Sequence, residues 1–93
     1  MPNEFDKYDS KQVNDKIYDL VEEQLGVEKS RLSSDSNFIN DLGADSLDMA
    51  ELIMAIEEEF FLTVQEDECE GIDTIQQCID KICEILKREG RLS

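Results

Sequence analysis

Ser46 is the side chain with the clearest chemical potential in this 93-residue sequence, and it stands in the segment DLGADSLD, residues 41–48. It falls at the first position of a predicted helix, after a long polar loop in which Gly43 allows a tight turn. A helix N-terminus offers unpaired N–H groups and the positive end of the helix dipole, so a phosphoester on this hydroxyl would be tolerated there. The simpler interpretation is that Asp45 and Ser46 only cap the helix.

Catalysis by the chain itself is not expected. The sequence contains no histidine, which excludes a Ser-His-Asp or Cys-His site and every histidine-ligated metal centre. Nothing in the chain can serve as the base that would make Ser46 a strong nucleophile, so another enzyme would have to modify it. A calcium loop of the EF-hand type also fails, because counting from Asp35 puts Ile39 at a ligand position and Asn40 where glycine is required.

The cysteines favour free thiols, since they are odd in number and show no C-x-x-C spacing: Cys69, Cys78 and Cys83. Reduced thiols fit a reducing compartment. The longest unbroken apolar run covers residues 52–56, far short of the roughly 20 residues that a membrane-spanning helix needs. We therefore expect a cytoplasmic protein, or one of an organelle matrix or stroma from which a transit peptide has been removed.

Apolar residues at helical spacing predict an all-α fold. They indicate helices over residues 11–25, over residues 46–60 and from residue 75 to about residue 88, with a turn or short helix within residues 64–71. No segment alternates with period two over the length of a strand. The expected architecture is a small four-helix bundle with three long helices, one short helix and a long loop between the first two.

Polar residues at helix starts provide the capping signals. Ser10 or Asn14 can cap the first helix, and Asp45 can cap the second. Thr74 is followed three residues later by Gln77, which is the spacing of a capping box. These signals predict where the helices begin.

The chain length allows one small domain. We expect that domain over residues 11–89, with flexible tails at residues 1–10 and 90–93. The loop of residues 26–45 is long for so small a domain, so it should have a function, be pinned to the core, or both. Its candidate anchors are Val27, Leu32, Phe38, Ile39 and Leu42.

Two apolar strips run along the predicted helix over residues 46–60. At 100° per residue, one strip forms a core face that contains Met49, Leu52, Ile53, Ile56 and Phe60. The opposite side carries Leu47, Ala50 and Met54, interleaved with Glu51, Glu57 and Glu58. Building a core needs only one apolar strip, so the second one indicates a binding face.

Acidic charge is concentrated on the same part of the chain. The sequence has 24 acidic and 9 basic residues, for a net charge of −15, and between Leu32 and Asp80 it has fourteen acids and no lysine or arginine. This field repels phosphate and anionic lipid, so binding to nucleic acid or to a membrane is not expected. A solvated acidic surface is one explanation. Because like charges on neighbouring turns destabilise a helix, we favour a face that steers basic partners.

The stretch DLGADSLDMAELIMAIEEEF, residues 41–60, closely resembles the signature of the acyl carrier proteins, with Asp45, Ser46 and Leu47 at its centre. The resemblance covers roughly residues 13–86. It implies that a phosphopantetheinyl transferase joins 4′-phosphopantetheine to Ser46 through a phosphodiester, and that the arm carries acyl thioesters between enzymes of fatty acid synthesis. It also implies a four-helix bundle, and we expect the protein to act as a monomer.

The resemblance also implies which surfaces act. Basic patches of partner enzymes would bind a face made of Asp45, Leu47, Asp48, Glu51, Met54, Glu57 and Glu58. The acyl chain would be held among candidate lining residues Ile53, Ile56, Ile72, Cys78 and Ile79, which could equally be plain core. The chain departs from the family pattern at Phe61, where glycine is common, at Gln65, where proline is frequent, and at Cys69.

Two alternatives keep the acidic face but change the role. A carrier dedicated to another acyl pathway, such as lipid A, polyketide or a specialised lipid, would bear the same modification and differ only in its partner surfaces. An unmodified interaction module would bind basic partners through the helix over residues 46–60 and leave Ser46 unloaded.

Overall fold

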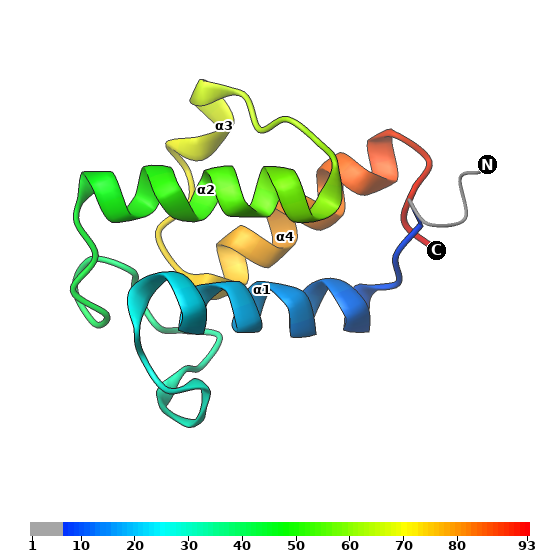
Figure 1. Cartoon of the computed structure of the whole chain (residues 1–93). Helices are drawn as coiled ribbons and strands as arrows, with labels where there is room; N and C mark the ends of the chain where they lie inside the picture. The colour runs from blue at the N-terminus through cyan, green and yellow to red at the C-terminus, as the bar shows by residue number, and fades with distance from the viewer. Residues whose placement is uncertain (1–6) are drawn as a thin grey trace.

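The structure, a computed structural model, describes residues 7–93 and consists of four helices joined by loops (Figure 1). The helices are α1 (Ser10–Leu25), α2 (Ser46–Phe60), α3 (Glu66–Cys69) and α4 (Ile75–Arg88), and a 3₁₀ turn, η2 (Lys29–Arg31), lies within the first long loop. The described residues form no strand, only two isolated β-bridges. The expected all-α fold with three long helices and one short helix is confirmed.

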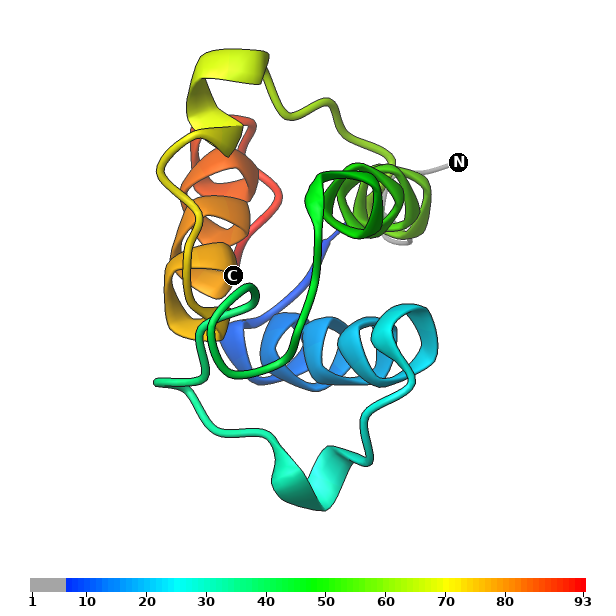
Figure 2. The same cartoon turned by 90° about the vertical axis from the view of Figure 1, so that its left-hand side faces the viewer.

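The three long helices surround a shared core. α1 and α2 run in opposite directions, and α4 packs against α1 and faces α2 across the centre of the molecule, while the short α3 lies above α2 and α4 (Figures 1 and 2). α1 approaches both α2 and α4 closely, whereas α2 and α4 have no comparable backbone approach, so side chains fill the space between them. In residues 7–93, no helix is long and apolar enough to cross a membrane.

The start of α1 corrects one sequence prediction. The N-cap is Asp9, not Ser10 or Asn14, because the Gln12 backbone N–H donates to Asp9 Oδ1 at 2.7 Å. The Asp9 backbone N–H in turn donates to Gln12 Oε1 at 3.0 Å, which completes a capping box. Ser10 is therefore already the first residue of the helix, one residue earlier than predicted.

The long loop is pinned against the start of α4. The Phe38 side chain is 1% exposed, and its backbone N–H donates to the Asp73 carbonyl at 2.9 Å. The Ile75 N–H donates to the Ser36 carbonyl at 3.1 Å, while the predicted capping box of Thr74 and Gln77 is present. The loop that joins α1 to α2 is thus also hydrogen-bonded to the start of α4.

One predicted anchor of this loop is wrong. Ile39 is 59% exposed, because it directly follows the buried Phe38 and points outward. Leu32 and Leu42 do pack against the core, and Val27 is half-buried.

The two ends of the described chain also differ from the tails expected for residues 1–10 and 90–93. Residues 1–6 lie outside the described part, but Tyr8 is buried. Its N–H donates to the Arg91 carbonyl at 2.8 Å, and its carbonyl accepts from the Ser93 N–H at 2.9 Å. The Tyr8 ring packs edge-to-face on Phe60, with ring centroids 5.0 Å apart. Residues 8 and 91–93 therefore pack together at one end of the core.

Candidate functional site

The site predicted around Ser46 lies where the long loop meets α2. Ser46 is the first residue of the helix, and its side chain is exposed. The preceding turn is fixed by Gly43, whose φ of 73° is in the left-handed region, and by buried Ala44, whose N–H donates to the Phe38 carbonyl at 2.9 Å. A buried anchor on each side of the glycine turn holds the serine at the surface.

Asp45 and Asp48 form a capping box around Ser46. The Asp48 N–H donates to Asp45 Oδ1 at 2.8 Å, and the Asp45 N–H donates to Asp48 Oδ2 at 3.1 Å. Asp45 as N-cap is confirmed. Its reciprocal bond with Asp48 was not predicted. The three-residue spacing of Asp45 and Asp48 is nevertheless that of a capping box, with Asp48 in the place of the usual Glu or Gln.

The outer face of α2 is as apolar and acidic as predicted. Leu47 is 66% exposed and Met54 is 57% exposed, and Ala50, Glu51 and Glu58 are exposed between them. On the inner face, Leu52, Ile56 and Phe60 are completely buried. Met49 and Ile53 are only partly buried, at the edge of the core.

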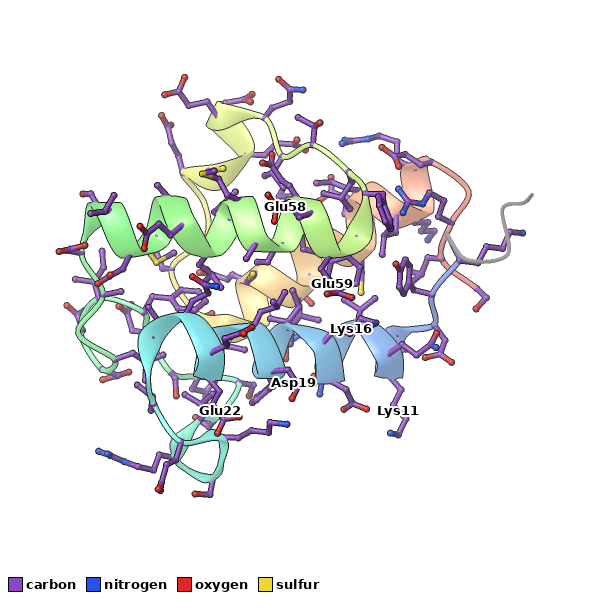
Figure 3. All side chains as sticks on the ribbon, in the orientation of Figure 1. Lys11, Lys16, Asp19, Glu22, Glu58 and Glu59 are labelled. Atoms are coloured by element: carbon purple, nitrogen blue, oxygen red, sulfur yellow. The ribbon has the colours of Figure 1, made fainter. Side chains whose placement is uncertain are left out.

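Two other glutamates of α2 have structural partners. Glu57 is half-buried, and its Oε2 accepts the Val64 backbone N–H at 2.8 Å, which holds the loop toward α3. Glu59 Oε2 lies 2.9 Å from Lys16 Nζ across the α1–α2 contact (Figure 3). Among the predicted binding residues, Asp48 and Glu57 are thus the two that are half-buried and hydrogen-bonded.

Few cations offset the acids near α2 and α3. Lys16 pairs with Glu59, and its pKa is raised because Glu59 accepts a hydrogen bond from its ammonium group. Arg88, at the end of α4, lies 3.3 Å from Glu68 of α3. In the part of the chain that the structure describes, no three acidic or cysteine side chains are grouped so that they could hold a metal ion.

Sequence reasoning left Phe61 out of the outer face. Phe61 follows α2 directly, is 71% exposed and has φ 53°. The left-handed region explains why a glycine is common at this position in the family that the sequence resembles. Phenylalanine at a position where the family commonly has glycine was the signal in the sequence that could have identified this residue.

Comparison with known proteins supports the same interpretation. A family model described as a phosphopantetheine attachment site matches residues 15–82. An acyl carrier protein of Cyanidioschyzon merolae (strain NIES-3377 / 10D) is 54% identical over 71 residues, which are 76% of this chain and 78% of that protein. An acyl carrier protein of Guillardia theta is 49% identical over 71 residues, or 76% of this chain and 88% of that protein.

The chain belongs to the acyl carrier protein family. The family assignment confirms that it is a carrier protein and that its cofactor is covalently attached 4′-phosphopantetheine. The residues present fit that cofactor, because α2 begins with an exposed hydroxyl at its N-terminus.

The five candidate lining residues of this carrier gather in the core. Ile56 and Cys78 are completely buried, and Ile72 and Ile79 are 6% and 5% exposed. Ile53 is partly buried and packs against the core cluster to which these four residues belong. Burial raises the pKa of the Cys78 thiol to about 12, with a smaller contribution from Cys69, so this thiol is a neutral apolar group at physiological pH. Across residues 7–93 no open pocket is found, and the five side chains pack as core.

Proposed function

We propose that Ser46 is the residue that bears 4′-phosphopantetheine, and that the protein carries acyl intermediates between enzymes of fatty acid synthesis. The observation that supports this is the exposed hydroxyl at the first position of α2, held by the Asp45–Asp48 capping box. When bound, the group supplies a terminal thiol that holds acyl groups as thioesters.

The start of α2 suits a phosphodiester electrostatically. The first N–H groups of a helix and its dipole favour one negative charge there. Asp45 and Asp48 are the nearest acids in the chain, and each turns one carboxylate oxygen toward the other's backbone N–H. These bonds hold one oxygen of each carboxylate on the helix backbone, and Ser46 itself is exposed, so that an enzyme can approach its hydroxyl from solvent.

The partner-binding face is the outer side of α2 with its N-terminal end. We infer that a phosphopantetheinyl transferase and fatty acid synthesis enzymes bind it through basic patches, because its exposed acids surround exposed apolar side chains. The predicted members of this face are Asp45, Leu47, Asp48, Glu51, Met54, Glu57 and Glu58. The carrier itself contributes no catalytic group and acts as a monomer, and its three free cysteines favour a reducing compartment such as the cytoplasm or an organelle matrix.

We also propose that an acyl chain enters between α2 and α4. The support is the difference in packing, since α1 approaches each of these helices closely while side chains alone span the space between α2 and α4. Ile53, Ile56, Ile72, Cys78 and Ile79 lie in the core, and parting them would not break a close backbone contact.

Intact-mass measurement tests the proposal. Incubation of the apo chain with coenzyme A and a phosphopantetheinyl transferase should add the mass of one phosphopantetheine, and Ser46→Ala should abolish the addition. Ser10→Ala is a matched control, because Ser10 is also exposed and is also the first residue of a helix behind a capping aspartate. Absence of any mass shift with an active transferase would indicate an unmodified interaction module.

A second measurement separates the pathways. A loaded carrier that is accepted by enzymes of fatty acid synthesis supports the housekeeping role. Acceptance only by enzymes of another acyl pathway, such as lipid A or polyketide assembly, would contradict that part of the proposal.

A further inference from the structure

Phe61 combines two unfavourable features. Of the large apolar side chains that the structure describes it is the most exposed, at 71%, and in residues 7–93 it is the one non-glycine residue with a positive φ, 53°. A left-handed backbone destabilises a residue that has a Cβ, and an exposed ring gains little from burial. The monomer derives no evident benefit from phenylalanine here, which points to a role in binding.

The backbone that presents Phe61 is held firmly. Arg91 Nη1 donates to the Phe61 carbonyl at 2.9 Å, and Arg91 Nη2 donates to the Phe60 carbonyl. The Tyr8 hydroxyl donates to the Glu59 carbonyl at 3.3 Å. Both ends of the described chain therefore cap the last carbonyls of α2, and an exposed ring on a fixed backbone loses less entropy when it is bound.

Phe61 also continues the apolar strip of α2. Leu47 and Met54 are seven residues apart, a step that turns only about 20° around a helix, and Phe61 directly follows the last residue of α2 at the C-terminal end of the strip. Their side chains are 66%, 57% and 71% exposed. At 1.5 Å per residue the strip extends over about 21 Å, with the exposed acids Glu51 and Glu58 beside it.

The charge identifies the occupant of this strip. A second copy of the chain would bring another net charge of −15 against the same acidic face, and anionic lipid would be repelled in the same way. A protein surface with an apolar pocket surrounded by lysine and arginine complements both the ring and the acids.

We propose that Phe61 is a third apolar anchor of the partner-binding face, after Leu47 and Met54, and that it inserts into an apolar pocket with a basic rim on the enzymes that use this carrier. The inference rests on the proposed function, since it adds a residue to that face. It assigns Phe61 a part in determining which enzymes bind.

Calorimetric titration of the loaded full chain with a purified enzyme of fatty acid synthesis that accepts the wild type tests the inference. Phe61→Asn and Phe61→Gly tolerate the left-handed backbone and remove the ring, so Kd should rise about five- to tenfold for each. Phe61→Leu keeps an apolar side chain and should change Kd by less than about twofold. An unchanged Kd in Phe61→Asn and Phe61→Gly would overturn the inference. It would also be overturned if these substitutions abolished self-association of the chain and left its binding to the enzyme intact.

Loading separates this inference from the proposed function. Each variant is first checked for the addition of one phosphopantetheine and for a cooperative thermal transition. If the wild type itself is not loaded at Ser46, the proposed function fails whatever Phe61 does. If all variants are loaded and bind the enzyme as the wild type does, only the role of Phe61 fails.

Discussion

Asp45 and Asp48 each accept a hydrogen bond from the other's backbone N–H, at 2.8 and 3.1 Å, and Ser46 lies between them in the sequence. The same pair of carboxylates therefore caps the start of the helix on which the proposed attachment site lies. Substitutions of Asp45 test this capping role, and the choice of substituent separates its hydrogen bond from its charge.

Asp45→Ala should lower the free energy of unfolding by about 1 kcal/mol, because it leaves the Asp48 N–H without its side-chain acceptor. Asp45→Asn keeps an acceptor and should lower it by less. Urea unfolding followed by circular dichroism measures both. Asp9→Ala removes the equivalent bond at α1 and should give a similar loss. Equal losses in Asp45→Asn and Asp45→Ala would mean that the charge, and not the hydrogen bond, stabilises α2.

Cys78 should resist thiol reagents that modify Cys69 and Cys83. Its side chain is completely buried, while the other two are half-buried. Timed alkylation at pH 8 followed by mass spectrometry should show two modified cysteines in the folded chain and three in urea. Rapid modification of Cys78 without denaturant would show that the core around it opens readily.

The same thiol should make stability depend on pH. Burial raises the pKa of Cys78 from 9.0 to about 12 in the folded chain, so the unfolded chain loses this proton first as the pH rises. The stabilisation is complete below pH 9 and is lost between pH 9 and about 12. Urea unfolding across this range should show a decline that is smaller in Cys78→Ala, and an equal decline in both chains would contradict the assignment.

The helical fold could be predicted from the sequence because the spacing of apolar residues shows which segments form helices and which face of each helix is buried. The apolar spacing in α2 separates Leu52 and Ile56, which are buried, from Leu47 and Met54, which are exposed, and the structure follows that division. The position of Ser46 at the start of α2 could likewise be predicted, since Asp45 is a strong N-cap signal.

Features that depend on distant parts of the chain could not be predicted. Tyr8 is buried because its ring meets Phe60 and its backbone meets residues 91–93, and no local pattern around Tyr8 carries that information. Ile39 was assigned to the core by its type alone, although the backbone of the loop turns it to solvent. Glu57 has the spacing of an outer residue, but the loop toward α3 folds back so that Val64 contacts it.

Glu51→Lys should weaken binding to a fatty acid synthesis enzyme and reduce the salt dependence of that binding. Glu51 is exposed on the outer face of α2, so reversing its charge removes attraction to a basic patch. Glu23→Lys is the matched control, since Glu23 is exposed on α1 and the substitution changes the net charge equally. Titrations at several salt concentrations measure both effects. Equal weakening in the two variants would show that net charge, and not the α2 face, attracts the partner.

Phe61→Gly should raise the free energy of unfolding by about 0.5–1 kcal/mol, the strain of a left-handed phenylalanine less the greater freedom of glycine in the unfolded chain. Little burial is lost, since the ring is 71% exposed. Phe61→Ala is the control, because it removes the ring and keeps a Cβ at φ 53°, so it should leave stability nearly unchanged. Urea unfolding measures both variants.

If Phe61→Gly is no more stable than Phe61→Ala, the backbone is not strained at this position. If Phe61→Gly is more stable and yet binds the enzyme more weakly, phenylalanine at this position improves binding at the expense of stability.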